Sequence, residues 1–253
     1  LCRLRDAIMA IEDQNVREHL LLAFSGMLRS HNLFCVYQKY YSKIDPLFAI
    51  HAFRPSTEAV ENNVWGAKYG QGTYCAGVRL IHGGLRWGQA PSDNWFISDD
   101  KYVKKPIEDG IWSTEARPLL ASRSSENLSG VVTGDISLCI TDPPYYGNVM
   151  YAELSDFFYV WLRTALGEQY PEQFNQPLTP KEEEVIENSH WVPKRGNRTQ
   201  AAEHLTKDQA FFTNGLTRIF AEAGNYMADG NLLVFTFHHQ ANEAWESVLQ
   251  TAL

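Results

Sequence analysis

Two adjacent prolines that follow an alternating apolar stretch constrain this chain more than any other feature. In ISLCIT (136–141), apolar residues alternate with smaller or polar ones, which is the two-residue period of a β-strand. Pro143 and Pro144 follow almost at once. Because proline has no backbone N–H to donate to a neighbouring strand, the two prolines end the strand. The sequence therefore predicts a buried strand that stops at a stiff turn, DPPY (142–145).

The spacing of apolar residues around this turn predicts an α/β fold. Apolar residues recur every three or four positions at 154–165, 212–227 and 241–252, which indicates helices, and NLLVFTF (231–237) has the length of a strand. Strand, helices, strand and helix in this order are typical of a parallel sheet with crossover helices, in which ligands bind beyond the carboxyl ends of the strands. We therefore predict a Rossmann-like parallel sheet with the DPPY turn at such an end.

The first 130 residues are less regular. A helical stripe covers residues 4–29, and sequence rich in Gly, Asn, Trp and Tyr follows. The stretch 66–84 contains the glycines of a phosphate-binding loop, but it neither follows an apolar strand nor opens a helical pattern, so a turn-rich loop is the preferred interpretation. We predict a helical and loop-rich accessory region at 1–130 and a separate α/β region at 131–253.

Charge and cysteine usage exclude several classes of protein. The 253 residues include 22 Lys and Arg against 30 Asp and Glu, a net charge of −8, so a nucleic acid could be bound only through a local basic surface. The four cysteines form no CxxC pair, which argues against a zinc ribbon. Since the chain has neither a long apolar run nor a leader, we expect a cytoplasmic protein with no membrane partner.

The DPPY turn has the parts needed to hold a nucleobase amine. An enzyme that alkylates an exocyclic amine takes the base out of the stack and engages the amino hydrogens. The Asp142 carboxylate and the Pro143 carbonyl are acceptors for two N–H bonds, Pro143 and Pro144 stiffen the turn, and Tyr145 offers a ring for stacking. The alternative interpretation is a rigid strand-end turn without chemistry.

Several segments resemble one family. The chain resembles bacterial adenine-specific DNA methylases whose full-length members also carry a zinc ribbon. The similar segments are TDPPYYGNVMYAELSDFFYVWLR, LTPKEEEV, GNLLVFTFHHQANEAWESVL, LLLAFSGMLRSHNLFCVY and ENNVWG. The resemblance implies a methyltransferase domain that transfers a methyl group from S-adenosylmethionine to adenine N6 in DNA. It implies that Asp142, Pro143, Pro144 and Tyr145 are the catalytic motif, and aspartate in first position favours adenine N6 over cytosine N4. DNA recognition would then fall to residues 1–130, and the partners would be DNA and other subunits of a restriction or phage-defence system.

The departures from this family concern the methyl donor. Such enzymes hold S-adenosylmethionine in a loop like DPFxGxG, which this sequence lacks, as it lacks the zinc ribbon. With the start at Leu1, this suggests the central and later part of a methylase that binds the donor weakly or not at all by itself. Asp135 is a candidate contact to the donor's adenine, and an ordinary turn aspartate before a strand is its alternative.

The long connection between the predicted helices contains the clearest basic cluster. WVPKRGNR (191–198) brings together Lys194, Arg195 and Arg198, for which contact with DNA phosphates and an ordinary solvated loop are both open. No metal site is predicted, because adjacent His238 and His239 on a strand would point to opposite faces.

Two other functions are compatible with the sequence, and residues 181–187 carry one further structural prediction. Methylation of an amine in RNA or of a protein amide is the first rival, because similar Pro-Pro-Tyr turns serve those acceptors. A non-catalytic DNA-binding or scaffold segment of a defence system is the second. KEEEVIE (181–187) is predicted to be the solvated start of a helix.

Overall fold

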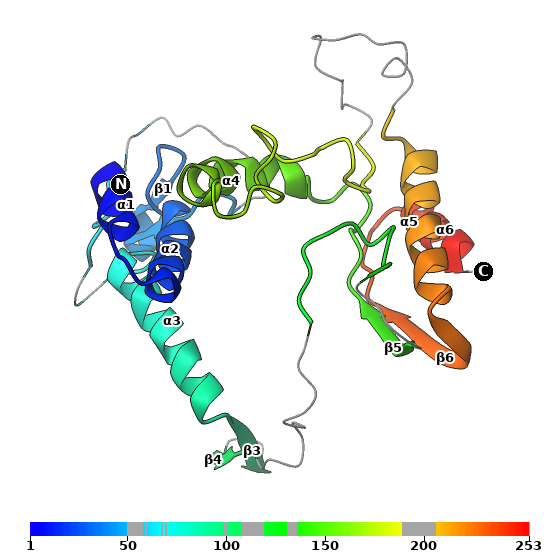
Figure 1. Ribbon diagram of the computed structural model, residues 1–253, viewed down its shortest axis with the longest axis horizontal. Coiled ribbons are helices and arrows are strands. Elements are labelled where there is room, and N and C mark those ends of the chain that lie inside the picture. Colours follow the sequence, from blue (N-terminus) through cyan, green and yellow to red (C-terminus); the bar gives the residue numbers. More distant parts are fainter. Residues whose placement is uncertain are drawn as a thin grey trace. The chain divides into compact units, whose positions relative to one another are not determined.

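A computed structural model describes most of the chain (Figure 1). It describes residues 1–49, 58, 60–66, 68, 70–98, 101–107, 119–130, 136–188 and 206–252. The contacts divide the chain into two compact units, which we describe separately: Leu1–Pro118 with Leu154–Leu178, and Leu119–Glu153 with Thr179–Leu253. The elements, in chain order, are α1 (Cys2–Met9), α2 (Gln14–Leu28), β1 (Val36–Gln38), the 3-10 helix η1 (Lys39–Tyr41), β2 (Lys43–Asp45), α3 (Tyr74–Gln89), β3 (Ser92–Ser98), β4 (Lys101–Pro106), β5 (Ile136–Thr141), α4 (Tyr151–Leu166), α5 (Gln209–Gly224), β6 (Met227–Phe235) and α6 (Asn242–Ala252).

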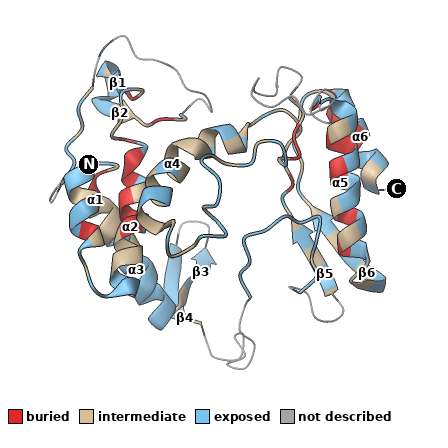
Figure 2. Cartoon of the chain, turned by 45° about the horizontal axis from the view of Figure 1, so that its top comes forward, coloured by how far each residue is buried: buried red, intermediate tan, exposed pale blue. Residues whose placement is uncertain are grey.

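A helical core organises the first unit. The apolar stripe at 4–29 forms two helices, α1 and α2, and the Asp13 carboxylate caps the second of them by accepting from the Val16 N–H at 2.9 Å. Figure 2 shows how the buried positions gather on α2. The buried apolar residues of this core, against which one side of α4 also packs, are Ile8, Leu21, Ala23, Phe24, Met27, Leu28 and Tyr74.

The turn-rich loop predicted at 66–84 is wrong from Tyr74 onward, where α3 begins. Thr73 caps this helix, with its hydroxyl accepting from the Ala76 N–H at 3.4 Å. The N–H groups of Tyr74 and Cys75 donate to the carbonyls of Val64 and Trp65 at 2.9 and 3.1 Å. The first amides of α3 therefore have backbone partners, and the preceding glycine loop is not a free phosphate cradle.

The second unit is built on a parallel strand pair. Strand β5 pairs with β6 in parallel, with Thr141 opposite Phe235, and α5 and α6 pack against each other beside the pair. Both helices contribute to one apolar cluster, which also includes Leu233 and Phe235 of β6. Its buried members are Val185, Phe212, Leu216, Phe220 and Val248.

The predicted Rossmann-like methyltransferase parallel sheet is wrong for the described residues. They form three two-stranded sheets, β1–β2, β3–β4 and β5–β6, and only the last is parallel. Strand, helices and strand in sequence specify a parallel pair, but they do not specify how many strands join it. The upstream strands instead close two antiparallel hairpins through short connections, as neighbouring strands readily do.

Strand β5 is also less buried than its pattern predicts. Its apolar residues Leu138 and Ile140, paired with Leu232 and Val234, lie on the face opposite α5 and α6 and are 51% and 72% exposed. Cys139 and Thr141, paired with Leu233 and Phe235, are half-buried on the face of the helices. Apolar alternation thus identified the strand, but the position of the helices decided which face is covered.

Two further expectations concern the chain as a whole. No helix among the described residues is both long enough and apolar enough to cross a bilayer. The predicted division into an accessory region at 1–130 and an α/β region at 131–253 stays a prediction.

Candidate functional site

The DPPY turn directly follows β5 in the second unit. Asp142 is exposed, Pro143 is buried, and Pro144 and Tyr145 are half-buried. The Tyr146 N–H donates to the Pro144 carbonyl at 3.0 Å, and Tyr146 has a left-handed backbone with φ of 56°. Buried and hydrogen-bonded at its centre, the turn presents the Asp142 carboxylate to solvent.

The end of β6 holds the turn through Thr236. The Thr236 hydroxyl donates to the Asp142 carboxylate in a short hydrogen bond, and it accepts from the Tyr145 hydroxyl at 3.4 Å. The Thr236 N–H donates to the Thr141 carbonyl at 3.2 Å, which continues the strand pairing by one residue. The Tyr145 ring packs edge-on against Phe237, with ring centroids 5.6 Å apart.

These contacts set the charge of the carboxyl group. The Thr236 hydroxyl and then the Tyr145 hydroxyl lower the pKa of Asp142, and they outweigh the opposing effect of desolvation. Burial raises the pKa of Tyr151 at the start of α4, and the charges of Asp142 and Tyr145 add to this effect. Asp142 is therefore an ionised acceptor at neutral pH.

A second set of contacts fastens the connection between the turn and α4. The Glu184 carboxylate accepts from the Ala152 N–H at 2.9 Å, in the first turn of α4. The Glu187 N–H donates to the Tyr146 carbonyl at 3.3 Å. A Cβ at Gly147 would lie 2.8 Å from a Glu187 carboxylate oxygen, so a side chain there would displace this contact. We call residues 184–188 the clamp segment.

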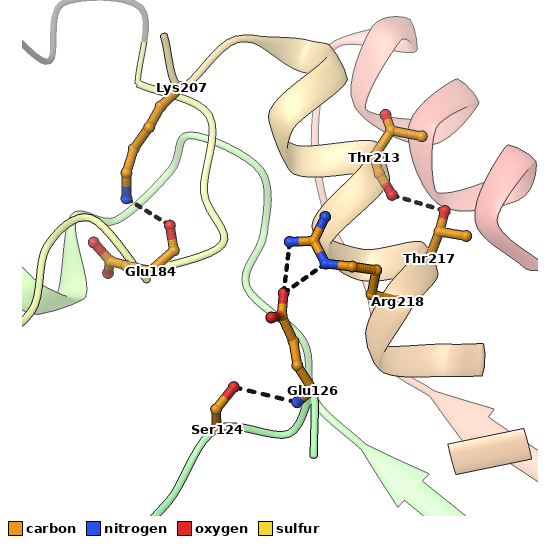
Figure 3. A network of polar contacts seen from close by, with 7 residues as sticks. All are labelled: Ser124, Glu126, Glu184, Lys207, Thr213, Thr217 and Arg218. Carbon is orange, nitrogen blue, oxygen red and sulfur yellow. Dashed lines mark hydrogen bonds and ion pairs between the residues drawn. The ribbon is translucent and has the colours of Figure 1, made fainter. Parts of the chain in front are cut away.

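Lys207 supports the clamp segment from within the protein. Its side chain is 1% exposed, and its amino group donates to the Glu184 backbone carbonyl at 2.5 Å (Figure 3). The amino group also lies 5.3 Å from the centre of the Phe211 ring, and the Asn188 N–H donates to the Lys207 carbonyl at 2.7 Å. Burial lowers the pKa of Lys207 and raises the pKa of Glu184. Each charge opposes the burial effect on the other, so the two groups stabilise each other's ionised form.

The solvated helix start predicted at 181–187 is wrong. Residues 181–183 form a turn, and Val185 and Ile186 are buried. Two adjacent apolar residues between glutamates were the available signal, because a fully solvated segment has no reason to carry both of them. Sequence reasoning also missed Thr236 and Lys207, whose partners lie far away in the chain.

The remaining predicted site residues fall outside the site that the structure describes. Asp135, Lys194, Arg195 and Arg198 all lie outside the described residues.

The two histidines lie beyond the end of β6. His239 Nδ1 accepts from the Ala241 N–H at 3.0 Å, its ring lies against Tyr146, and the His238 carbonyl accepts from Asn148 at 3.4 Å. In the described part of the chain, no three His, Cys, Asp or Glu side chains are placed to share a metal ion.

The first unit contains a hollow between α1, α2 and α3, but its lining is apolar around Leu20 and Val78. S-adenosylmethionine carries a charged ammonium, a carboxylate and ribose hydroxyls, which need polar partners. This hollow does not fit the donor. Comparisons of the chain with protein-family models, curated proteins and solved structures found no match.

Proposed function

We propose that the DPPY turn holds the exocyclic amine of adenine in DNA for methylation at N6. The observation that carries the proposal is the exposed Asp142 carboxylate, kept ionised beside the Tyr145 ring at the carboxyl end of a parallel strand pair. Ligands bind at this edge in α/β proteins, and a carboxylate beside an aromatic ring suits a base that has an amino group.

Each residue of the turn has a separate role in this proposal. The Asp142 carboxylate accepts one amino hydrogen, and the Pro143 carbonyl, to which no described residue donates, accepts the other. Engaging both hydrogens turns the nitrogen lone pair away from the ring. The Tyr145 ring stacks on the base, and the edge contact with Phe237 holds it in place.

The residues of the DPPY turn bind the acceptor base and not the methyl donor. S-adenosylmethionine, which the resemblance to DNA methylases implies, would supply the methyl group. The proposal therefore concerns the binding and orientation of the acceptor base.

The test compares two single strands of DNA that differ at one position. One strand contains adenine among thymines, and the other contains purine, which lacks only the amino group. We expect the chain to bind the adenine strand roughly tenfold more tightly, because a hydrogen bond to a charged group contributes about 1.5–3 kcal/mol. Asp142→Ala should abolish this preference, and Tyr145→Ala should weaken the binding of both strands by about 1–3 kcal/mol.

Glu246→Ala is the matched control, since it removes an exposed carboxylate from α6 of the same unit. It should leave the preference unchanged. Equal affinity of the unaltered chain for both strands would contradict the proposal, and tighter binding of the corresponding RNA would contradict DNA as the acceptor. With S-adenosylmethionine in excess, the chain by itself should form little or no N6-methyladenine, because it lacks the donor loop. Any N6-methyladenine that mass spectrometry does find should fall about a hundredfold in Asp142→Ala. Equal product from Asp142→Ala would contradict the role of this carboxylate.

A further inference from the structure

We propose that Thr236 is the positioning residue of this site, which sets the orientation of the Asp142 carboxylate and the Tyr145 ring together. The inference rests on the proposed function, because it names a residue that prepares the same turn to receive an amine. Thr236 itself does not touch the base.

The hydroxyl of Thr236 joins the two groups in one directed relay. The Tyr145 hydroxyl donates to the Thr236 oxygen, and the Thr236 hydroxyl donates to Oδ1 of Asp142. A hydroxyl has one hydrogen to donate, so the direction of both bonds is set once the carboxylate is ionised. Oδ1 is engaged in this relay, and in our proposal the other carboxylate oxygen accepts the amine.

The position of Thr236 follows from the pairing of the two strands. Thr141 and Phe235 are opposite each other at the ends of β5 and β6, and Asp142 and Thr236 are the next residue on each chain. The Thr236 N–H, bonded to the Thr141 carbonyl at 3.2 Å, keeps this register. A hydroxyl at this place thus reaches the first residue of the turn without any adjustment of the backbone.

The surroundings of Asp142 support a specific role for this hydroxyl. From the turn itself, Tyr145 faces the carboxylate, and from the start of α4, Tyr151 interacts with its charge. No lysine, arginine or histidine among the described residues contributes to the lowered pKa of Asp142. The Thr236 hydroxyl is the largest influence that favours the ionised form.

Two substitutions separate the hydroxyl from the shape of the side chain. Thr236→Val keeps the branched shape and removes the hydroxyl, whereas Thr236→Ser keeps the hydroxyl. Thr217→Val is the matched control, because it removes an exposed hydroxyl from α5 that donates to the Thr213 carbonyl (Figure 3) and lies 3.5 Å from the Thr251 hydroxyl of α6, away from Asp142.

The first measurement needs no ligand. In an NMR titration of the Asp142 side-chain carboxyl, Thr236→Val should raise the pKa towards the usual range of aspartate. Thr236→Ser and Thr217→Val should leave it near that of the unaltered chain. An unchanged titration in Thr236→Val would overturn the inference, whatever the chain does to DNA.

The second measurement follows the preference for the adenine strand over the purine strand as pH falls. In Thr236→Val the preference should drop roughly tenfold at neutral pH, and its loss on acidification should begin at higher pH, because the carboxylate takes up a proton earlier. Thr236→Ser should restore both. If Thr236→Val only lowered stability, binding to both strands would weaken equally and the pH profile would not change. That result would contradict the positioning role. If the titration shifts but the unaltered chain shows no preference for adenine, the proposed function fails and the relay stands.

Discussion

The two units hold their functional and structural parts in different ways. In the first unit, the core comes from helical stripes, and the buried residues of α1 and α2 are neighbours along the sequence. In the second unit, Thr236 bonds to Asp142, 94 residues earlier in the chain, and Glu184 bonds to Ala152, 32 residues earlier. A local pattern identifies the helices of the first core, although α4 also packs on it, whereas an exposed acceptor group is held in place by polar contacts from distant segments.

The difference extends to what is buried. The apolar cluster of the first unit packs helix against helix, with Phe24 edge-on to Trp161 at 5.7 Å between ring centroids. In the second unit, the apolar cluster reaches the site itself, because Tyr146 beside the DPPY turn packs on Phe212 at 5.2 Å. The buried side chain of Lys207 lies beside the clamp segment of the same unit. Packing and site are therefore coupled in the second unit.

The largest expected effect tests this coupling in both cores. Phe24→Ala and Phe212→Ala should each lower the free energy of unfolding by about 3–5 kcal/mol, since both rings are buried. Only Phe212→Ala should also reduce the preference for the adenine strand, because it removes the ring on which Tyr146 rests. Denaturant unfolding and DNA binding, measured below the unfolding transition, check both parts. Loss of the adenine preference in Phe24→Ala would contradict the inference that only the second core is coupled to the site.

A smaller effect is expected from the buried amino group. Lys207→Met should lower the free energy of unfolding by about 1–3 kcal/mol, because it leaves the half-buried Glu184 carbonyl without this donor. Lys104→Met on the exposed strand β4 is the control, and it should change stability by no more than about 0.5 kcal/mol. Urea unfolding of the two variants decides the matter. Equal effects would mean that Lys207 does not support the clamp segment.

The smallest effect should be the same in both units. Asp13 caps α2 and Asp208 caps α5, each by accepting a backbone N–H at 2.9 Å. Replacing either residue by Ala should lower stability by about 1 kcal/mol, and replacing it by Asn should restore most of the loss. Thermal unfolding of the four variants measures this. A clearly larger loss at Asp208 would show that the cap of α5 also serves the site, and the contrast between the units would then extend to local contacts.

The sequence predicted the elements after residue 130 better than their assembly. Strand β5, the three helices α4, α5 and α6, and strand β6 all lie where the spacing of apolar residues indicates, with ends shifted by a few residues. The extended parallel sheet was wrong, as was the loop where α3 forms. Periodicity reports which residues share a face, but the number of strands in a sheet depends on contacts between segments that no local pattern encodes.

The candidate site divides in the same manner. Asp142, Pro143, Pro144 and Tyr145 were recognisable because the acceptors, the stiff backbone and the ring are contiguous in the sequence. Their place after a strand followed from the inability of proline to donate a backbone hydrogen bond.

Only the tertiary structure decided how the turn is supported. The short bond from Thr236 to Asp142 exists because β5 and β6 pair in parallel with their ends level. The burial of Lys207 beside Glu184 exists because the chain returns to the clamp segment before α5 begins. A hydrogen bond acts only over about 3 Å, so residues far apart in sequence gain such a role only when the fold brings them together.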